Sequence, residues 1–509
     1  LLLPLSPSLH FPTASRIAYN HPMTSRPDTP DTSDTSSTPS TPTAPTPSPP
    51  SPHADLPPDA LASPLARAGL EVARRLQAAG HQACFVGGCV RNALLGLPVK
   101  DIDLATSARP DQVAALFERC ESVGAHFGVQ IVVLEDFQFE VATFRAEGAY
   151  VDHRRPTQVR YGSFDDDWRR RDFTVNAIYY DPLARRLLDP AGGRDDLAQR
   201  RLRAVGDPDL RFAEDALRLL RAVRFAGRYD LIIEPATAAA IRRHGATLRA
   251  ISIERVADEL TAILTGPRPG RAMHLMDDLG LWTHVIPEIE PMKGCPQPPE
   301  FHPEGDVFVH TALVLDLLHE AWGGAPPPEL AWAALLHDVG KPPTLTHDGR
   351  IRFPEHQRVG AAMADQILRR LRLPNRIREI AVQLVAGHMR FMDVADMKQS
   401  KLRRFLGQPH FDQHLALHLA DCRGSHGKLD NYRFCLDQAE RFRRDDAQAA
   451  LLPEPLLTGH DLIALGLKPG PAFSRILEAV RDEQLEGHLA DRDAALAWLR
   501  DHRADFEAI

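Results

Sequence analysis

The chain has 509 residues, more than one hydrophobic core organises, so we expect several domains. Charged residues at 25% and hydrophobic residues at 43% are ordinary for a soluble globular protein. The net charge of -8 excludes a globally basic protein, so any contact with nucleic acid must use local basic patches.

Residues 1–60 are predicted to be a disordered extension. From residue 24 onward Pro, Ser and Thr dominate, and such a segment buries too little apolar surface to offset the entropy of ordering. The first methionine is Met23, and no basic segment precedes the apolar start. We therefore expect no signal peptide, and translation from Met23 or from a non-Met start codon.

The first folded elements are a helix over 65–79 and an apolar strand over 83–86. Gly87 and Gly88 follow the strand, and a short helix ending at Gly96 follows them. Because glycine has no Cβ, phosphates can approach the backbone N–H groups of this turn.

A second strand is expected to carry Asp101 and Asp103. Residues i and i+2 of a strand share a face, so the two carboxylates should project side by side, where they repel unless a divalent cation lies between them. This suits Mg²⁺ carrying a nucleoside triphosphate and predicts a nucleotidyl-transfer site. Glu140 is either a third carboxylate or a charge on a solvated strand face, because the pairing register is not readable from the sequence.

The remaining pattern predicts a small α/β head on a mixed or antiparallel sheet, followed by helices. A helix is expected over 110–120, and two strands over 130–134 and 137–144 form a hairpin. After residue 195 strand signals fade, and the predicted helices cover 212–228, 235–244, 253–264 and 271–279. An all-helical region to about residue 422 and a final helical segment follow the Pro-rich break at 296–303.

Polar residues inside an apolar run mark a second part of the predicted site. Arg171 can hold phosphate oxygens as a fork, Asp172 can accept from ribose hydroxyls, and Asn176 can donate to a phosphate. A basic strand entry is the simpler explanation, but Asp and Asn among apolar neighbours require partners.

Asp215 and Arg218 are three residues apart on a predicted helix, so they should share a face. An intrahelical ion pair is the ordinary interpretation. Alternatively, an acceptor beside a donor fork complements the Watson–Crick edges of cytosine and adenine, and leaves unpaired groups against uracil and guanine. One such pair could select two nucleotides without a template.

A second constellation lies further along the chain. His337 and Asp338 are adjacent at the end of an apolar helix that Gly340 is expected to close. Imidazole and carboxylate ligands suit Mn²⁺, Ni²⁺, Fe²⁺ or Mg²⁺ with open positions for water. The remaining candidates are His310, His356, His388 and Asp421.

These motifs together resemble the class II CCA-adding tRNA nucleotidyltransferases, within the family shared with bacterial poly(A) polymerases. One departure is Asn92, where the family usually has Asp. The similarity runs from about residue 80 to 290, on Gly87-Gly88-x-x-Arg91, Asp101-x-Asp103, Arg171-Asp172, Asp189-Pro190-x-Gly192-Gly193, Val205-Gly206-Asp207-Pro208, Glu214-Asp215-x-x-Arg218 and Ile253-Glu254-Arg255.

The resemblance implies an α+β fold, with a nucleotidyltransferase head like the palm of DNA polymerase β and all-α neck, body and tail domains. It implies that Asp101 and Asp103 bind catalytic Mg²⁺, with Glu140 as the candidate third carboxylate. The loop over 147–168 corresponds to a flexible segment that helps switch from C to A. The residues implied to bind the nucleotide are Gly87, Gly88, Arg91, Arg171, Asp172, Asn176, Asp215, Arg218 and Arg221.

The second constellation resembles the HD-type metal phosphohydrolases, whose pattern is H…HD…D. HD domains joined to this family occur in multifunctional CCA enzymes, which implies hydrolysis of phosphorylated RNA 3′ ends with Mg²⁺ or a transition metal. His310, His337, Asp338 and Asp421 match the pattern, and His356 and His388 are candidates for a second metal. The expected boundaries are 1–60 extension, 61–190 head, 191–295 neck, 296–425 HD domain and 426–509 tail.

The expected activity is template-independent addition of CCA to tRNA from CTP and ATP, in which the RNA 3′-OH attacks the α-phosphate. Poly(A) polymerase is the alternative, although the strongly basic C-terminal arm of that enzyme is not evident in residues 490–509. Enzymes that add only CC or only A remain open. A (p)ppGpp synthetase/hydrolase places its HD domain first, and a non-catalytic RNA-binding protein would not need both sets of ligands.

No apolar run is long enough to cross a bilayer, and no membrane contact is expected. The six cysteines include no C-x-x-C pair, which indicates free thiols in a reducing cytoplasm. Residues 458–471 resemble C-terminal segments of CCA-type enzymes and form either a loop for the tRNA elbow or a packing turn.

Overall fold

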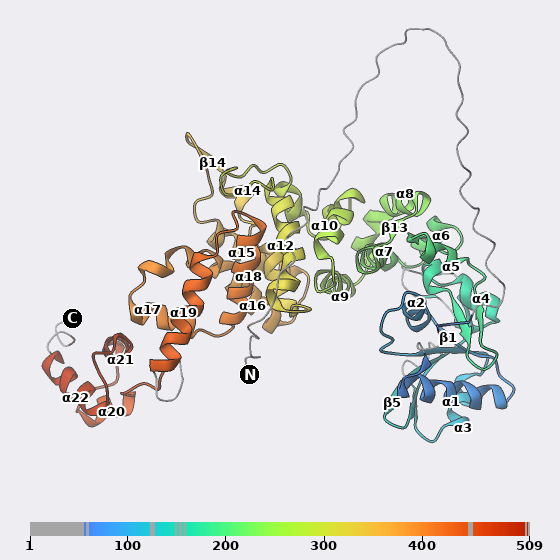
Figure 1. The fold of residues 1–509 in the computed structure, drawn as a ribbon, viewed down its shortest axis with the longest axis horizontal. Helices are drawn as coiled ribbons and strands as arrows, with labels where there is room; N and C mark the ends of the chain where they lie inside the picture. The colour runs from blue at the N-terminus through green and yellow to red at the C-terminus, as the bar shows by residue number, and fades with distance from the viewer. Residues whose placement is uncertain are drawn as a thin grey trace, which may run out of the picture. The chain divides into compact units, whose positions relative to one another are not determined.

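The computed structural model describes residues 55–57, 61–122, 128–147, 150–151, 155–156, 159–445, 451–503 and 506 (Figure 1). Most of the predicted disordered extension lies outside them, as do seven positions of the loop over 147–168. Within the described part, two residues that were placed in this extension contact the folded chain. Leu56 is buried in the hydrophobic core, and Asp55 accepts a hydrogen bond of 2.6 Å from the hydroxyl of Tyr180.

A seven-stranded sheet forms the head, in the order β11-β10-β1-β2-β5-β4-β3. β2 and β5 are parallel, whereas the other neighbours are antiparallel, so of the two predicted kinds of sheet, mixed or antiparallel, the head has the mixed one. The strands are β1 Ala83–Val86, β2 Asp103–Thr106, β3 Cys120–Ser122, β4 Val129–Leu134, β5 Phe137–Thr143, β10 Tyr179–Asp181 and β11 Arg186–Leu188.

Helices α1 (Pro64–Ala78), α2 (Gly88–Leu94) and α3 (Pro110–Leu116) complete the first part of the head. α1 begins after Ser63, whose side chain accepts from a backbone N–H of the first turn. Gly69 lets α1 approach the sheet, since a Cβ there would lie 3.2 Å from the ring of Phe139. The helix predicted to reach residue 120 ends earlier, because residues 120–122 join the edge of the sheet as β3.

Two short antiparallel pairs lie in and beside the loop over 147–168, and helix α4 (Phe164–Arg169) follows them. The first pair joins β6 (Arg145–Glu147) to β9 (Val159–Tyr161), and the second joins β7 (Tyr150–Val151) to β8 (Arg155–Pro156).

The neck is helical apart from one parallel pair, β12 (Arg201–Leu202) with β13 (Ile232–Ile233). The helix predicted over 212–228 is wrong, because the chain forms two helices with an extended Asp215 (φ -141°, ψ 102°) between them. The neck contains α5 Gly193–Ala198, α6 Pro208–Glu214, α7 Leu217–Tyr229, α8 Pro235–His244, α9 Ile253–Leu264 and α10 Pro269–Asp278.

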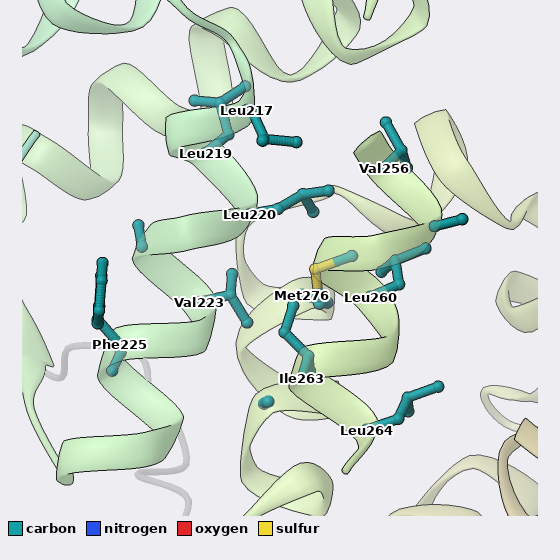
Figure 2. Packing of buried hydrophobic residues seen from close by; sticks show 14 of the residues in the cluster. Leu217, Leu219, Leu220, Val223, Phe225, Val256, Leu260, Ile263, Leu264 and Met276 are labelled. Carbon is teal, nitrogen blue, oxygen red and sulfur yellow. The ribbon is translucent and has the colours of Figure 1, made fainter. Parts of the chain in front are cut away.

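The neck core is built from the apolar faces of α7, α9 and α10 (Figure 2). Leu220 and Val223 of α7 lie across from Leu260 and Ile263 of α9, with Met276 of α10 between them. All five side chains are at most 4% exposed. This packing joins helices that are far apart in sequence and makes a firm support for the segment around Asp215.

The HD region is a helical bundle with one addition, the short antiparallel ribbon β14 (Thr346–His347) and β15 (Ile351–Arg352), so the all-helical prediction is wrong there. Its helices are α12 Val307–Trp322, α13 Pro328–Leu336, α14 Lys341–Thr344, α15 His356–Arg370, α16 Asn375–Gly387, α17 Gln399–Leu406 and α18 Phe411–Gly424. α19 (Asp430–Asp445) follows them, in the segment predicted to be the tail.

Gly340 does not close α13 in a left-handed conformation, because its φ is -81°. Glycine is needed there for another reason: a Cβ would lie 2.2 Å from the carbonyl oxygen of His356. The missing side chain therefore lets α15 approach the His337-Asp338 segment.

The C-terminal helices α20 (Gly459–Ala464), α21 (Pro471–Glu486) and α22 (Arg492–Asp501) have a small hydrophobic core of their own. Gln399 and Ser400 of α17 bond to Leu485 and Glu486 at the end of α21. No described helix is both long and apolar enough to span a bilayer. All six cysteines are free thiols, as predicted.

Candidate functional sites

Carboxylates gather where β2 meets β5. Asp103, the first residue of β2, lies opposite Glu140 of β5 in parallel register. The strand of Glu140 therefore abuts that of Asp103, a point that the sequence left open. Glu140 and Asp101 are exposed, whereas Asp103 is half-buried. Burial, together with the charges of Glu140 and Asp101, raises the pKa of Asp103 to about 6. A divalent cation would relieve this repulsion, so the donor set fits Mg²⁺.

Asp101 does not lie in a strand. β2 begins at Asp103, and Asp101 belongs to the irregular segment before it. The predicted alternation of side chains along a strand therefore does not account for the position of Asp101 beside Asp103. The connection after α2 brings Asp101 close enough for its charge to act on Asp103.

The glycine turn adjoins these carboxylates because Val86, the last residue of β1, pairs with Asp103. Gly87 has φ +72°, a conformation that side chains disfavour. A Cβ on Gly87 would lie 3.7 Å from Nη1 of Arg171, so that guanidinium lies beside the turn. Arg171 is held there by the hydroxyl of Tyr179 at 2.7 Å and by Asp167 at 3.1 Å.

Four of the predicted nucleotide-binding residues form one hydrogen-bonded network, in which three are buried and Arg221 is half-buried. Arg91 donates to Asn176, Asn176 donates to Asp172 at 3.0 Å, and Arg221 donates to Asp172 at 2.7 Å. Although burial opposes it, the Arg221 guanidinium lowers the pKa of Asp172 to about 2. The guanidinium of Arg91 also lies 4.1 Å from the ring centroid of Tyr229. The network thus ties the glycine turn of the head to α7 of the neck.

Asp215 and Arg218 lie on either side of the start of α7 and are held by different neighbours. Arg255 of α9 donates to Oδ2 of Asp215 at 3.1 Å. Arg218 is buried and donates to Glu214 at 2.7 Å and to the carbonyl of Arg170 at 2.9 Å. Asp215 and Arg218 therefore do not share one helix face, in contrast to the prediction. Arg255 of α9 supports Asp215, and this contact was not predicted. The only sequence signal for it was the Ile253-Glu254-Arg255 stretch.

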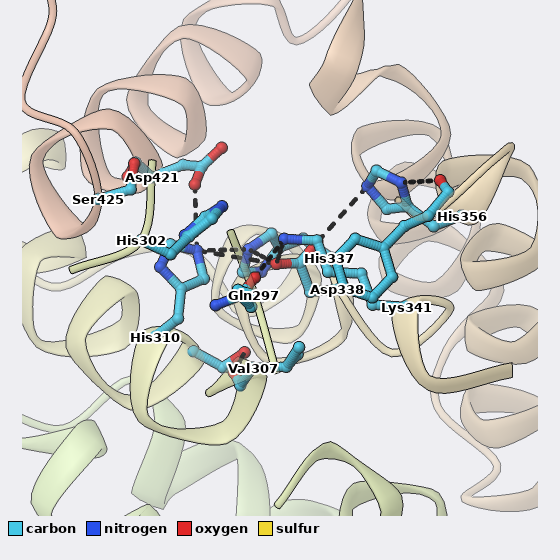
Figure 3. A network of polar contacts seen from close by, with 12 residues as sticks. Gln297, His302, Val307, His310, His337, Asp338, Lys341, His356, Asp421 and Ser425 are labelled. Atoms are coloured by element: carbon cyan, nitrogen blue, oxygen red, sulfur yellow. Dashed lines mark hydrogen bonds and ion pairs between the residues drawn. The ribbon is translucent and has the colours of Figure 1, made fainter. Parts of the chain in front are cut away.

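The predicted HD residues converge in the interior of the helical bundle (Figure 3). Nε2 of His310 lies 3.1 Å from Oδ1 of Asp421 and 3.4 Å from Nε2 of His337. Nε2 of His337 lies 3.3 Å from Oδ2 of Asp338. His310, His337 and Asp338 are each at most 1% exposed.

Asp338 also faces a second pair of histidines with its other oxygen. Oδ1 of Asp338 lies 3.6 Å from Nε2 of His356 and 3.8 Å from Nε2 of His388. The two Nε2 atoms are 3.2 Å apart. Asp338 therefore offers one carboxylate oxygen to each of two candidate ligand groups.

The protons of these histidines can be assigned from their partners. Nδ1 of His337, His356 and His388 each lies 2.7–3.0 Å from a backbone carbonyl three residues earlier. A carbonyl only accepts, so Nδ1 carries the proton and Nε2 presents a lone pair to the cluster. Burial and the neighbouring His337 lower the pKa of His388 to about 4, which keeps it neutral. Lone pairs this close fit divalent cations between them.

A cavity of about 550 Å³ opens beside this cluster. Lys341 lies at its wall, with Nζ 2.7 Å from Oδ2 of Asp338 and 2.7 Å from Gln297. Three further cationic or aromatic side chains line the cavity, namely Arg352, Phe353 and Lys428. Two exposed apolar side chains also line it, Phe301 (51% exposed) and Met392 (60% exposed). These lining residues were not predicted, because they come from four separate segments.

Comparisons with known proteins agree with this arrangement. The family model of the poly(A) polymerase head domain matches residues 83–203, the model of the probable RNA- and SrmB-binding site of polymerase A matches 230–293, and the HD domain model matches 307–421. Several curated CCA-adding enzymes are 41–44% identical, although the chain spans only about half of their length.

Two other relatives match over nearly their whole length. A CCA-adding enzyme of Levilactobacillus brevis is 31% identical over 84% of this chain and 95% of its own. An A-adding tRNA nucleotidyltransferase of Deinococcus radiodurans is 35% identical over 82% of this chain and 95% of its own. The crystal structure of the Bacillus stearothermophilus CCA-adding enzyme in complex with CTP has a TM-score of 0.66 and 27% identity, covering 87% of this chain and 99% of that one. The chain therefore belongs to the tRNA nucleotidyltransferase and poly(A) polymerase family, in a form that carries an HD domain.

Proposed function

We propose that the protein adds CCA to the 3′ end of tRNA from CTP and ATP in the cytoplasm. The observation that carries the proposal is the parallel register that sets Glu140 beside Asp103, next to the glycine turn. Mg²⁺ held by Asp101, Asp103 and Glu140 would neutralise the triphosphate and make the RNA 3′-OH a better nucleophile. Arg171 lies where it can contact phosphate oxygens above Gly87.

Base selection is assigned to Asp215 and Arg218. Each side chain is supported by a separate neighbour, Arg255 for Asp215 and Glu214 for Arg218. An acceptor and a donor held in fixed positions can favour cytosine and adenine over uracil and guanine without a template. Asp172 and Asn176 contribute by fixing the neck against the glycine turn, since both are engaged by protein groups.

Addition of A alone is the second candidate, because the Deinococcus radiodurans relative that matches across 95% of its length adds A. The segment over 147–168, proposed to help switch from C to A, lies partly outside the described residues. The head and neck residues that contact the nucleotide are shared by both candidates. The nucleotides that the enzyme adds to tRNA, rather than the residues of its site, distinguish CCA addition from addition of A alone.

We also propose that the HD region is a metal-dependent phosphohydrolase acting on phosphorylated RNA 3′ ends. His310, His337, Asp338 and Asp421 would hold one cation and Asp338, His356 and His388 a second; such cations supply one activated water and Lewis acidity for cleavage of the ester P–O bond, which releases phosphate and the RNA hydroxyl. The cavity supports a nucleotide-sized substrate, since its volume of about 550 Å³ exceeds the space needed by a phosphate alone. Lys341 would bind a phosphoryl oxygen, and Phe301 and Met392 would receive the base.

The first experiment is addition to a tRNA transcript that lacks its 3′ end, with Mg²⁺ and labelled CTP and ATP. Extension by C, C and A followed by arrest supports CCA addition. Extension of a tRNA ending in CC by a single A, with no incorporation of CTP, supports the A-adding alternative. A ladder of A residues indifferent to CTP overturns both in favour of a poly(A) polymerase.

The catalytic assignment is tested by Asp101→Ala and Asp103→Ala in the same assay. Each is expected to abolish addition while circular dichroism of the full chain stays unchanged. Measurable addition by Asp101→Ala at ordinary Mg²⁺ concentration would contradict the assignment of this carboxylate to the metal site.

A further inference from the structure

Glu304 is not one of the predicted HD ligands, but its carboxylate contacts the predicted ligand His310 through the ring nitrogen Nδ1. It belongs to the short segment that precedes α12, and its side chain is only 9% exposed. A single oxygen, Oε1, lies 2.7 Å from Nδ1 of His310 and 2.8 Å from Nδ1 of His302. The two imidazole rings meet edge to face, with centroids 4.9 Å apart.

This contact determines which nitrogen of His310 faces the cluster. A carboxylate oxygen accepts, so Nδ1 of His310 donates to Glu304, and Nε2 is left to face the cluster, where a bound cation would take its lone pair. That Nε2 is the atom 3.1 Å from Asp421 and 3.4 Å from Nε2 of His337. His302 donates to the same oxygen from the other side and braces the carboxylate in place. Figure 3 shows His302 beside His310 and Asp421.

His310 differs in this respect from the other three histidines of the cluster. His337, His356 and His388 donate through Nδ1 to uncharged backbone carbonyls. A carboxylate behind an imidazole makes the other nitrogen a stronger ligand and fixes the ring orientation. Within the described residues of the cluster, the carboxylate support falls on the His310 side alone, opposite the His356 and His388 pair.

We propose that Glu304 is a positioning residue, braced by His302, that makes His310 a strong Nε2 ligand for the cation on the Asp421 side. This inference rests on the proposed metal-dependent hydrolase. It predicts unequal cation sites, with the His310 side binding more tightly than the His356 and His388 side. Losing such a carboxylate lowers metal affinity by about 10–100-fold.

The test measures Ni²⁺ affinity by calorimetry in the full chain carrying Asp101→Ala and Asp103→Ala, so that the head does not contribute. Glu304→Ala is expected to weaken the tighter site about 10–100-fold. Glu304→Gln retains an acceptor oxygen without the charge, so its Ni²⁺ affinity should lie between those of the parent and Glu304→Ala. Glu300→Gln, at an exposed glutamate of the same segment, is the matched control and should leave the affinity unchanged. The visible spectrum of bound Co²⁺ should change with Glu304 and not with Glu300.

Two outcomes separate this inference from the function beneath it. If His337→Ala leaves Ni²⁺ binding intact, the cluster is not the metal site and the proposed hydrolase itself fails. If His337→Ala removes binding but Glu304→Gln binds Ni²⁺ within twofold of the parent with an unchanged Co²⁺ spectrum, Glu304 does not position His310. Should Glu304→Ala fail to fold, the Gln variant decides the question.

Discussion

Asp103 and Glu140 lie opposite each other on the parallel strands β2 and β5, although 36 residues separate them in the sequence. This pairing brings an exposed carboxylate to a half-buried one at the end of the glycine turn. The pair therefore combines an exposed carboxylate with one whose charged form the fold disfavours.

Glu140→Gln is expected to lower the single-turnover rate of CTP addition by at least about 100-fold, because one negative ligand of the proposed metal site is lost. The fold should persist, since the Glu140 side chain is exposed. Gln138→Ala, two residues earlier on the same face of β5, is the control and should keep full activity. Equal rates for the two variants would remove Glu140 from the site.

Asp103→Asn should stabilise the head while abolishing addition. The pKa of Asp103 is raised to about 6 in the fold, above its ordinary value of 3.8, so the charged form disfavours folding at higher pH. In EDTA the gain should approach about 3 kcal/mol well above pH 6, since about two pKa units correspond to about 1.4 kcal/mol each, and it should fade as the pH falls toward 4. Hydrogen exchange of the β2 amides at pH 8 and pH 4 measures it. An equal gain in stability at pH 8 and at pH 4 would contradict the electrostatic cause.

Arg255→Ala should loosen base selection more than it slows addition, because it frees Asp215 without removing it. We expect discrimination of CTP against UTP to fall about tenfold or more, measured as the ratio of kcat/KM values. Glu254→Ala changes the neighbouring exposed residue, which pairs with Arg372, and should preserve the ratio. An unchanged ratio in Arg255→Ala would show that Asp215 needs no support from α9.

His337→Ala should remove phosphohydrolase activity and leave nucleotide addition intact, since His337 is a proposed metal ligand that contacts both His310 and Asp338. His347→Ala, at an exposed histidine of β14, is the control and should retain both activities. Loss of addition in His337→Ala with an unchanged fold would mean that the two sites are not independent.

Phe301→Ala should raise the KM for a 3′-phosphorylated nucleotide about tenfold, because stacking on an exposed aromatic ring contributes to base binding. The kcat should change little, and hydrolysis of glycerol 2-phosphate, which has no base, should be unaffected. A matching rise of KM for both compounds would place Phe301 at the phosphate rather than at the base.

The sequence by itself determined many of the local elements and indicated which donor groups each candidate site offers. The apolar strand over 83–86, the hairpin after residue 129, and the helices over 235–244 and 253–264 follow from periodicity, capping and glycine, which act within one turn or one strand. The Asp101-x-Asp103 and His337-Asp338 motifs identified the kinds of ligand because residue type alone decides which atoms they offer.

Only the tertiary structure decided how these residues meet. The register that pairs Glu140 with Asp103 depends on packing of the whole sheet, since a slip of one residue would turn Glu140 to the other face. The break at Asp215 arises where Arg255 of a later helix contacts it, against the local helical pattern. Asp338 faces two histidine pairs, and Glu304 supports His310, because distant helices place their side chains within a few ångströms, a distance that no local spacing encodes.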